Sequence, residues 1–313
     1  MFPVLRNIII FTLLIALSVN QSYCQDGKDK GYFLLGPEKE TFSKDFNDGK
    51  RLLHYTHEGM IVSDNSESPW NDASMYVQGS ALVDKDGKRI ADVALCESTD
   101  PDGDLCWFVF WASEDGSELT IKAGTGKWKN IAGSAVFLEG QGKRADGYFK
   151  FPWELSWKIL ADNELPGPID PGKYEFHDKG LSFHGPHVKS LDKQLSNGVN
   201  LLYSDQCGVL LSENKDAVSP RNFATCFDRG TTYIYEGSNL GDCMLLEDTD
   251  PDGDIVWLYH EWWYGKGPGS YEFIGGTGKW KGITGRGVTL GMLKARTDDH
   301  FMLRSEMHWN IEE

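Results

Sequence analysis

Apolar and polar residues alternate along two stretches of the chain, residues 149–159 and residues 301–311. A period of two with one apolar face predicts β-strands that lie with one side on a core. Residues 105–111 and 255–263 are instead almost continuously apolar, a pattern that favours strands covered on both faces. Short strands of both kinds, separated by Gly and Asp-Gly turns, predict a barrel or a sandwich.

The sequence contains two copies of one unit. Residues 97–104 (ESTDPDGD) reappear as residues 247–254 (EDTDPDGD), and GTGKWK occurs at residues 124–129 and again at residues 276–281. Self-similarity that extends over most of the length indicates a tandem duplication.

The domain boundaries follow from this repeat. We expect copy one at residues 31–160 and copy two at residues 173–313. Residues 161–172 contain three prolines and two glycines and are typical of an extended linker. With 35 glycines, 12% aromatic residues and no long stretch of helical period, the composition predicts an all-β chain.

Residues 1–24 have the features of a secretory signal peptide. Arg6 is followed by an apolar run over residues 8–19 that is too short to span a bilayer, and then by small and polar residues. Cleavage after Cys24 is the favoured processing, and a lipid-modified Cys24 is the alternative. No later stretch is apolar enough to cross a membrane, so we expect a secreted or periplasmic protein. Its formal net charge of −16 argues against binding to nucleic acid or to anionic lipid.

Export permits disulfides, and the cysteines that remain after cleavage are odd in number, which leaves at least one unpaired. Cys96 and Cys106 lie symmetrically about Pro101 and would face each other in a hairpin that turns there. Cys226 and Cys243 could likewise lie on adjacent strands. Sequence alone leaves both pairings open.

The GTGKWK segments look like phosphate-binding loops, but such a loop needs Ser or Thr directly after its lysine and a helix behind it. Trp128 and Trp280 follow the lysines, and further turn glycines come next. We therefore expect a strand, a tight turn and a strand, without a bound nucleotide. The sequence implies no other cofactor.

The acidic segments are candidates for calcium binding, because three carboxylates on alternate residues of a turn can collect oxygen ligands. These carboxylates belong to Asp100, Asp102, Asp104, Asp250, Asp252 and Asp254. Glycine stands at the fourth position of each loop rather than at the sixth, so we favour hairpin turns with glycine at a positive φ angle and favour no metal site.

No motif of nucleophilic or zinc catalysis occurs: there is no G-x-S-x-G, H-E-x-x-H or C-x-x-C. His184 and His187 are interpreted as residues of a solvated loop, with a metal site as the alternative. The tryptophans of the continuously apolar strands are candidates for lining a ligand cavity; they are Trp107, Trp111, Trp257 and Trp263.

Copy two has Tyr259 and Glu261 where copy one has Val109 and Trp111. If this side of the strand faces a barrel interior, the carboxylate is poorly solvated, its pKa is raised, and Tyr259 and Glu261 become candidate catalytic residues. If the side faces outward, Glu261 is a solvated charge and His260 faces inward.

Several segments of copy two together resemble bacterial secreted proteins of the allene oxide cyclase-like barrel group, which is related in fold to plant allene oxide cyclases and dirigent proteins. The segments are Cys226, the Gly-Asp-Cys triplet that ends at Cys243, residues 248–254 and residues 275–285. The resemblance covers residues 80–160 and 200–311. It implies an eight-stranded antiparallel barrel with a hydrophobic interior in each copy, and it implies a fold rather than a reaction. Copy one departs from copy two by having Met75 and Val93 in place of Cys226 and Cys243.

Two functions follow as hypotheses. The first is binding of an apolar small molecule or a protein partner, in the barrel cavities or at a shared interface. The second is a cyclase or isomerase that orients an apolar substrate within a barrel. The repeat preserves turns and aromatic residues rather than inward polar groups, which favours binding. Neither the ligand nor the oligomeric state follows from the sequence.

Overall fold

The computed structural model describes residues 26–161, 164–165, 169–195, 198–214, 219–294 and 300–312. The expected signal peptide, residues 1–24, lies outside the described residues. Within the described ranges, no helix combines the length and the apolar character needed to cross a membrane.

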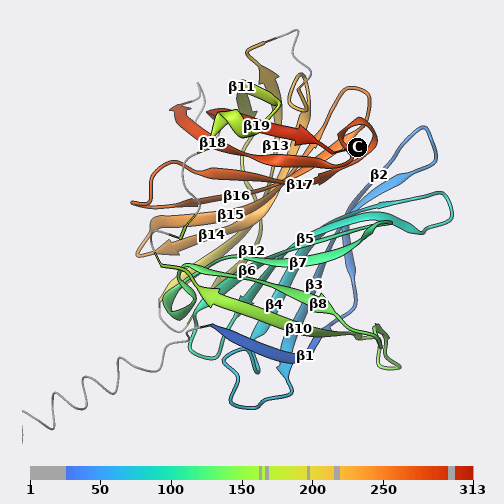
Figure 1. Ribbon diagram of the computed structural model, residues 1–313, viewed down its shortest axis with the longest axis vertical. Helices are drawn as coiled ribbons and strands as arrows, with labels where there is room; N and C mark the ends of the chain where they lie inside the picture. Colours follow the sequence, from blue (N-terminus) through green and yellow to red (C-terminus); the bar gives the residue numbers. More distant parts are fainter. Residues whose placement is uncertain are drawn as a thin grey trace, which may run out of the picture.

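The chain forms two closed antiparallel barrels of eight strands each, one from each copy of the repeat (Figure 1). This confirms the predicted fold class of two tandem β-barrels. Barrel one begins at Gly27, ahead of the predicted start of copy one at residue 31, because its first strand pairs along its whole length with the last strand of the same barrel.

In barrel one, the first strand closes the wall by pairing with both its third and its tenth strand. The wall strands, in the order in which they pair, are β1 (Gly27–Leu35), β10 (Phe149–Ile159), β8 (Ile131–Phe137), β7 (Gly116–Gly124), β6 (Leu105–Ser113), β5 (Arg89–Thr99), β4 (Ser74–Val83) and β3 (Arg51–Ser63). Two shorter strands lie outside this ring, β2 (Lys39–Asp45) against β3 and β9 (Gly142–Lys143) against β10.

Barrel two repeats this order. Its wall strands are β11 (Phe176–His184), β19 (Phe301–Ile311), β18 (Ile283–Lys294), β17 (Ser270–Gly276), β16 (Ile255–Trp263), β15 (Ser238–Thr249), β14 (Thr225–Tyr235) and β13 (Val199–Ser212). Strand β11 closes the ring by pairing with β13 and β19, and β12 (Val188–Gln194) flanks β13 as β2 flanks β3.

The alternation of side chains along each strand produces three cores. The inward residues of each barrel form a core inside that barrel. A third core lies between the barrels, where the outer faces of β5 and β6 pack against those of β15 and β16 (Figure 1). Strands β6 and β16 are therefore covered on both faces, which explains their almost continuously apolar sequences.

Two buried carboxylates connect the barrels across this third core. Glu97 of barrel one accepts hydrogen bonds from the hydroxyl of Tyr203 in barrel two and, at 3.2 Å, from the indole of Trp107. Burial raises the pKa of Glu97, although these hydrogen bonds oppose the shift. Because its partner hydroxyl comes from the other barrel, Glu97 is satisfied only when the barrels are docked.

Glu247 is the equivalent residue of barrel two and reaches in the opposite direction. It lies 3.2 Å from Nε2 of His54 and accepts a hydrogen bond of 2.6 Å from Ser80, both residues of barrel one. Burial by itself raises its pKa, but the hydrogen bond with His54 and the charge of buried Arg229 outweigh burial and lower the pKa to about 2. Copy one has Gln78 where copy two has Arg229, so Glu97 lacks this cation.

The acidic turn and the GTGKWK segment, which recur in both copies, form one structural unit. Asp100, in the turn between β5 and β6, accepts backbone hydrogen bonds from Asp102 and Asp104 at 2.9 and 3.0 Å. Its other oxygen accepts from the indole of Trp128 at 2.8 Å and lies 2.9 Å from the ammonium of Lys127. GTGKWK therefore fastens the acidic turn to the barrel wall.

The second copy has the same unit. The indole of Trp280 donates to Asp250 at 2.9 Å, and the ammonium of Lys279 lies 2.8 Å from the same carboxylate. Gly103 and Gly253 both have a φ angle of 91°, as the hairpin interpretation requires. Protein donors thus already occupy the carboxylate oxygens of Asp100 and Asp250 that calcium would need.

Neither of the two possible disulfides forms, and every cysteine within the described ranges is free. The β5–β6 hairpin pairs Thr99 with Leu105, so it is centred on Asp102 rather than on Pro101. Cys96 therefore lies opposite Phe108, and Cys106 lies opposite Ser98. Across β14 and β15, Cys226 lies opposite Asp248 and Cys243 lies opposite Thr231.

The two interface carboxylates predict opposite dependences of stability on pH. The pKa of Glu247 is lowered on folding, so its contribution is present above about pH 4.5 and is lost as the pH falls through about 2. We expect Glu247→Gln to cost on the order of 2–3 kcal/mol at neutral pH and progressively less in acid, measured by urea unfolding across this range. The matched variant Glu97→Gln should show the opposite slope, because the pKa of Glu97 is raised. Parallel pH profiles for the two variants would contradict this account.

The turn unit predicts unequal roles for two neighbouring aspartates. The side chain of Asp250 is 3% exposed and accepts four donors, whereas that of Asp252 is 76% exposed and contacts Lys279. Asp250→Ala should lower the free energy of unfolding by about 3 kcal/mol, and the control Asp252→Ala by less than about 1 kcal/mol. Equal effects, or a melting temperature of the wild type that rises by several degrees in calcium, would contradict the interpretation.

Candidate functional site

The interior of barrel two contains a cavity of ≈ 650 Å³. Its apolar wall includes Leu246, Leu258 and Met307, and ionisable side chains face the same space. Leu290 and Met292 of β18 also line it and are exposed, so the cavity reaches the molecular surface. A pocket of this size and composition is typical of sites for small organic molecules.

The repeat supplies an internal comparison for this cavity. Asp29 and Asp178 occupy equivalent places, since each accepts hydrogen bonds from two serines of its own barrel. With the strands aligned in this way, apolar interior residues of barrel one have polar counterparts in barrel two: Leu35 becomes His184, Trp70 becomes Arg221, Met75 becomes Cys226, Val77 becomes Asp228, Phe110 becomes His260 and Trp153 becomes Ser305.

Two of these exchanges account for the space. In barrel one, Trp70 stacks on Trp128 with ring centroids 4.1 Å apart, and Trp153 is fully buried beside the same core. In barrel two, Arg221 donates a hydrogen bond to Ser305 instead. Replacing two indoles by a slimmer side chain and a hydroxymethyl group leaves volume that the neighbouring residues do not fill.

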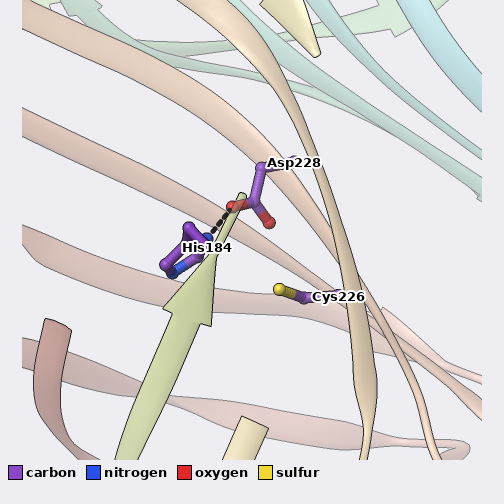
Figure 2. A group of neighbouring side chains, drawn as sticks. All are labelled: His184, Cys226 and Asp228. Atoms are coloured by element: carbon purple, nitrogen blue, oxygen red, sulfur yellow. Dashed lines mark ion pairs between the residues drawn. The ribbon is translucent and has the colours of Figure 1, made fainter. Parts of the chain in front are cut away.

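His184, Cys226 and Asp228 form a buried cluster at this cavity, and Figure 2 shows their side chains pointing toward a common space. Nδ1 of His184 lies 2.9 Å from Oδ2 of Asp228. The two groups are in close contact without an aligned hydrogen bond, and neither ring nitrogen has a hydrogen-bond partner within the described residues. Burial raises the pKa of the Cys226 thiol well above its usual range, which makes it a poor nucleophile.

Asp248 adds a fourth functional group to the lining. Burial raises its pKa to about 8, with Asp228 and Glu247 acting in the same direction and Arg221 opposing them. At neutral pH this carboxyl group is therefore protonated and can donate a hydrogen bond into the cavity. Copy one has Ser98 at this position.

Barrel one also has an interior cavity, of ≈ 340 Å³, and its chemistry is different. Asp92 accepts a hydrogen bond of 2.5 Å from Tyr55 and pairs with Arg89, so its polar groups are bound to one another. Burial raises the pKa of Asp92 to about 6 against the opposing charge of Arg89. Barrel one therefore has a smaller cavity than barrel two, and the carboxylate in it is paired with protein donors.

The predicted ligand-lining tryptophans lie elsewhere. All four face the neighbouring barrel, where Trp107 packs against Trp263 and Trp111 against Trp257 at centroid distances of 5.2 and 5.5 Å. Neither barrel cavity includes any of the four among its described lining residues. These aromatic residues form the interface core.

Tyr259 and Glu261, the predicted catalytic candidates, lie on the same outer face. The hydroxyl of Tyr259 is 3.3 Å from Glu261 and 3.3 Å from Sγ of Cys243. His260, between them in sequence, lines the cavity, as expected for the outward arrangement of Glu261. Strand β16 thus directs His260 into the cavity, and it directs Tyr259 and Glu261 to the outer face.

The two histidines of the expected solvated loop differ from each other. His184 is the last residue of β11 and is 4% exposed, whereas His187 is exposed at the cavity rim. The sequence contained a signal for this site that the search for motifs missed. Comparing the copies at alternate strand positions pairs His184 with Leu35 and Asp228 with Val77, and both pairs exchange an apolar residue for an ionisable one.

Comparisons with protein-family models, with curated proteins and with solved structures give no match. The cavity itself is therefore the basis for inferring function.

The cluster predicts a particular pattern of stability. Replacing both members of a buried polar pair by apolar residues is often neutral or stabilising. Replacing only one member leaves the other buried without its partner, which is destabilising. We expect His184→Leu to lower the free energy of unfolding by about 3 kcal/mol, and the double variant with Asp228→Val, which installs both residues of copy one, to recover most of that loss. Urea unfolding measures both. A double variant less stable than the single would show that the two side chains do not act as a pair.

Proposed function

We propose that this protein binds a small amphipathic organic molecule inside barrel two, and that barrel one serves as its structural partner. The exchange of apolar for ionisable residues at equivalent interior positions is the observation that supports this most directly. Duplication gave both copies the same wall, yet the cavity of barrel one is the smaller of the two, and that of barrel two is larger and has more ionisable residues in its lining. Buried polar groups without partners are costly, so their retention favours a functional role.

The composition of the lining favours an amphipathic ligand over the purely apolar one expected from the sequence. Leu246, Leu258 and Met307 offer contact to a hydrocarbon or ring portion. Arg221 and the protonated carboxyl of Asp248 offer donors to an oxygen-bearing group. Such a molecule would enter past Leu290 and Met292 at the rim.

We place the protein outside the cytoplasm, as a secreted or periplasmic member of the allene oxide cyclase-like barrel group. The signal-like residues 1–24 and the turn motifs of both copies support this assignment.

A cyclase or isomerase is the second candidate function. The observation that favours it is the presence, in one cavity, of a carboxyl group that is protonated at neutral pH and an imidazole beside a carboxylate. Two groups with different proton affinities can act as acid and base on a substrate held between them. The candidate residues are then Asp248 and His184 rather than Tyr259 and Glu261.

Binding can be tested with 1-anilinonaphthalene-8-sulfonate, an amphipathic fluorescent probe. We expect saturable fluorescence enhancement by the wild type and at least tenfold weaker binding, about 1.4 kcal/mol, by Arg221→Trp/Ser305→Trp, which installs the two indoles of barrel one. The double variant should fold, because barrel one accommodates the same pair at equivalent positions.

Two controls locate the probe. Val136→Trp adds an indole to an exposed position, and Ala94→Met fills the cavity of barrel one with the residue that copy two carries as Met244. Both should bind the probe as the wild type does. Unchanged binding by a folded Arg221→Trp/Ser305→Trp variant, or loss of binding in Ala94→Met, would refute the assignment of the site to barrel two.

A further inference from the structure

Three potential metal ligands from two strands converge in barrel two. His184 ends β11, while Cys226 and Asp228 lie two residues apart on the inward face of β14. One ligand atom from each lies within 4.8 Å of the others. All three residues are buried, with exposures of 4%, 3% and 4%.

From this arrangement we propose that His184, Cys226 and Asp228 bind one late first-row divalent cation, with zinc as the reference metal and a fourth coordination position open to the cavity.

The donor set decides the class of metal. A thiolate and an imidazole favour zinc and its neighbours over magnesium or calcium, which prefer sites made of oxygen ligands. Three protein ligands with one free position are typical of zinc sites that act on a bound molecule rather than of closed structural sites. The acidic turns at Asp100 and Asp250, in contrast, offer oxygen donors that lysine and tryptophan already occupy.

The unused hydrogen-bonding capacity at the cluster gives independent support. Both ring nitrogens of His184 and one oxygen of Asp228 are buried without a hydrogen-bond partner among the residues the structure describes. A buried imidazole and carboxylate in this condition are costly, and coordination to a cation would give one ring nitrogen and the carboxylate a partner. The divalent charge also balances one thiolate and one carboxylate, so the occupied cluster carries no net charge.

Barrel one shows what the same wall contains without such a site. The equivalent positions hold the apolar residues Leu35, Met75 and Val77, and all three line the cavity of barrel one. The three candidate ligands are therefore a coordinated departure within one barrel. A cation here would place a Lewis acid beside the organic ligand of the proposed function, but its binding does not require that ligand.

Cobalt titration of the full chain, after dialysis against a chelator, tests the site spectroscopically. We expect one equivalent of Co²⁺ to bind with a thiolate-to-cobalt charge-transfer band and the visible absorption of a tetrahedral site, and Zn²⁺ to displace it. Cys226→Met, which installs the copy-one residue, should abolish the charge-transfer band. Asp228→Val and His184→Leu should weaken binding at least tenfold.

Two matched cysteine variants serve as controls. Cys243→Val removes another buried thiol in favour of the copy-one residue, and Cys207→Ser removes the exposed thiol. Both should keep the band. A wild type without the band, a band that survives in Cys226→Met, or a band that disappears in Cys207→Ser would overturn the proposal.

A measurement on the wild type does not depend on any variant folding. X-ray absorption of the zinc-loaded chain should show one sulfur at about 2.3 Å and nitrogen or oxygen neighbours at about 2.0–2.1 Å. A coordination shell without sulfur would also overturn the proposal. Because neither experiment uses an organic probe, failure of this site and failure of the proposed ligand-binding function are distinguishable.

Discussion

Burial of two barrel walls against each other is the constraint on which the rest of this structure depends. A closed barrel normally presents the outer face of every strand to water, but β5, β6, β15 and β16 have apolar residues on both faces because the other barrel covers their outer side. The tryptophans of these strands have each other as partners. Glu97 and Glu247 make the contact specific in geometry, because each carboxylate has hydrogen-bonding partners that belong to the opposite barrel. The docked pair is thus the unit in which both buried carboxylates of the interface have hydrogen-bond partners.

This constraint explains which parts of the fold could be predicted. The alternation over residues 149–159 identified strands with one buried face, and the repeated turn motifs revealed the duplication. Those signals are local, and the structure confirms the two barrels that they imply. The continuous apolar strands gave no such guidance, because a strand covered on both faces has no polar side to show which residues point inward. Trp107 was therefore a candidate for lining a cavity, and the direction of Tyr259 and Glu261 stayed open, because the same pattern equally fits an interface.

The register of the β5–β6 hairpin is the second feature that the sequence could not predict. Cys96 and Cys106 would have faced each other had the turn been centred on Pro101, and a displacement of that centre to Asp102 moves each opposite a different residue. The centre is fixed by Asp100, whose carboxylate accepts the backbone N–H groups of Asp102 and Asp104 and the side chains presented by the distant GTGKWK segment. A contact between segments that far apart in sequence decides the register, so local spacing could not.

The cavity of barrel two shows why a duplicated chain can retain a costly site. His184, Asp228 and Asp248 are buried at positions where barrel one has the uncharged residues Leu35, Val77 and Ser98, and the pKa of Asp248, raised to about 8, reflects the free-energy cost of burying it. A lone barrel with this interior would also lose the interface core. Docked to a partner filled by Trp70, Trp128 and Trp153, barrel two gains a large apolar contact that does not involve its cavity. Barrel one therefore contributes mainly to stability and barrel two carries the functional groups. The apolar contact between the barrels offsets the free-energy cost of the polar groups buried in barrel two.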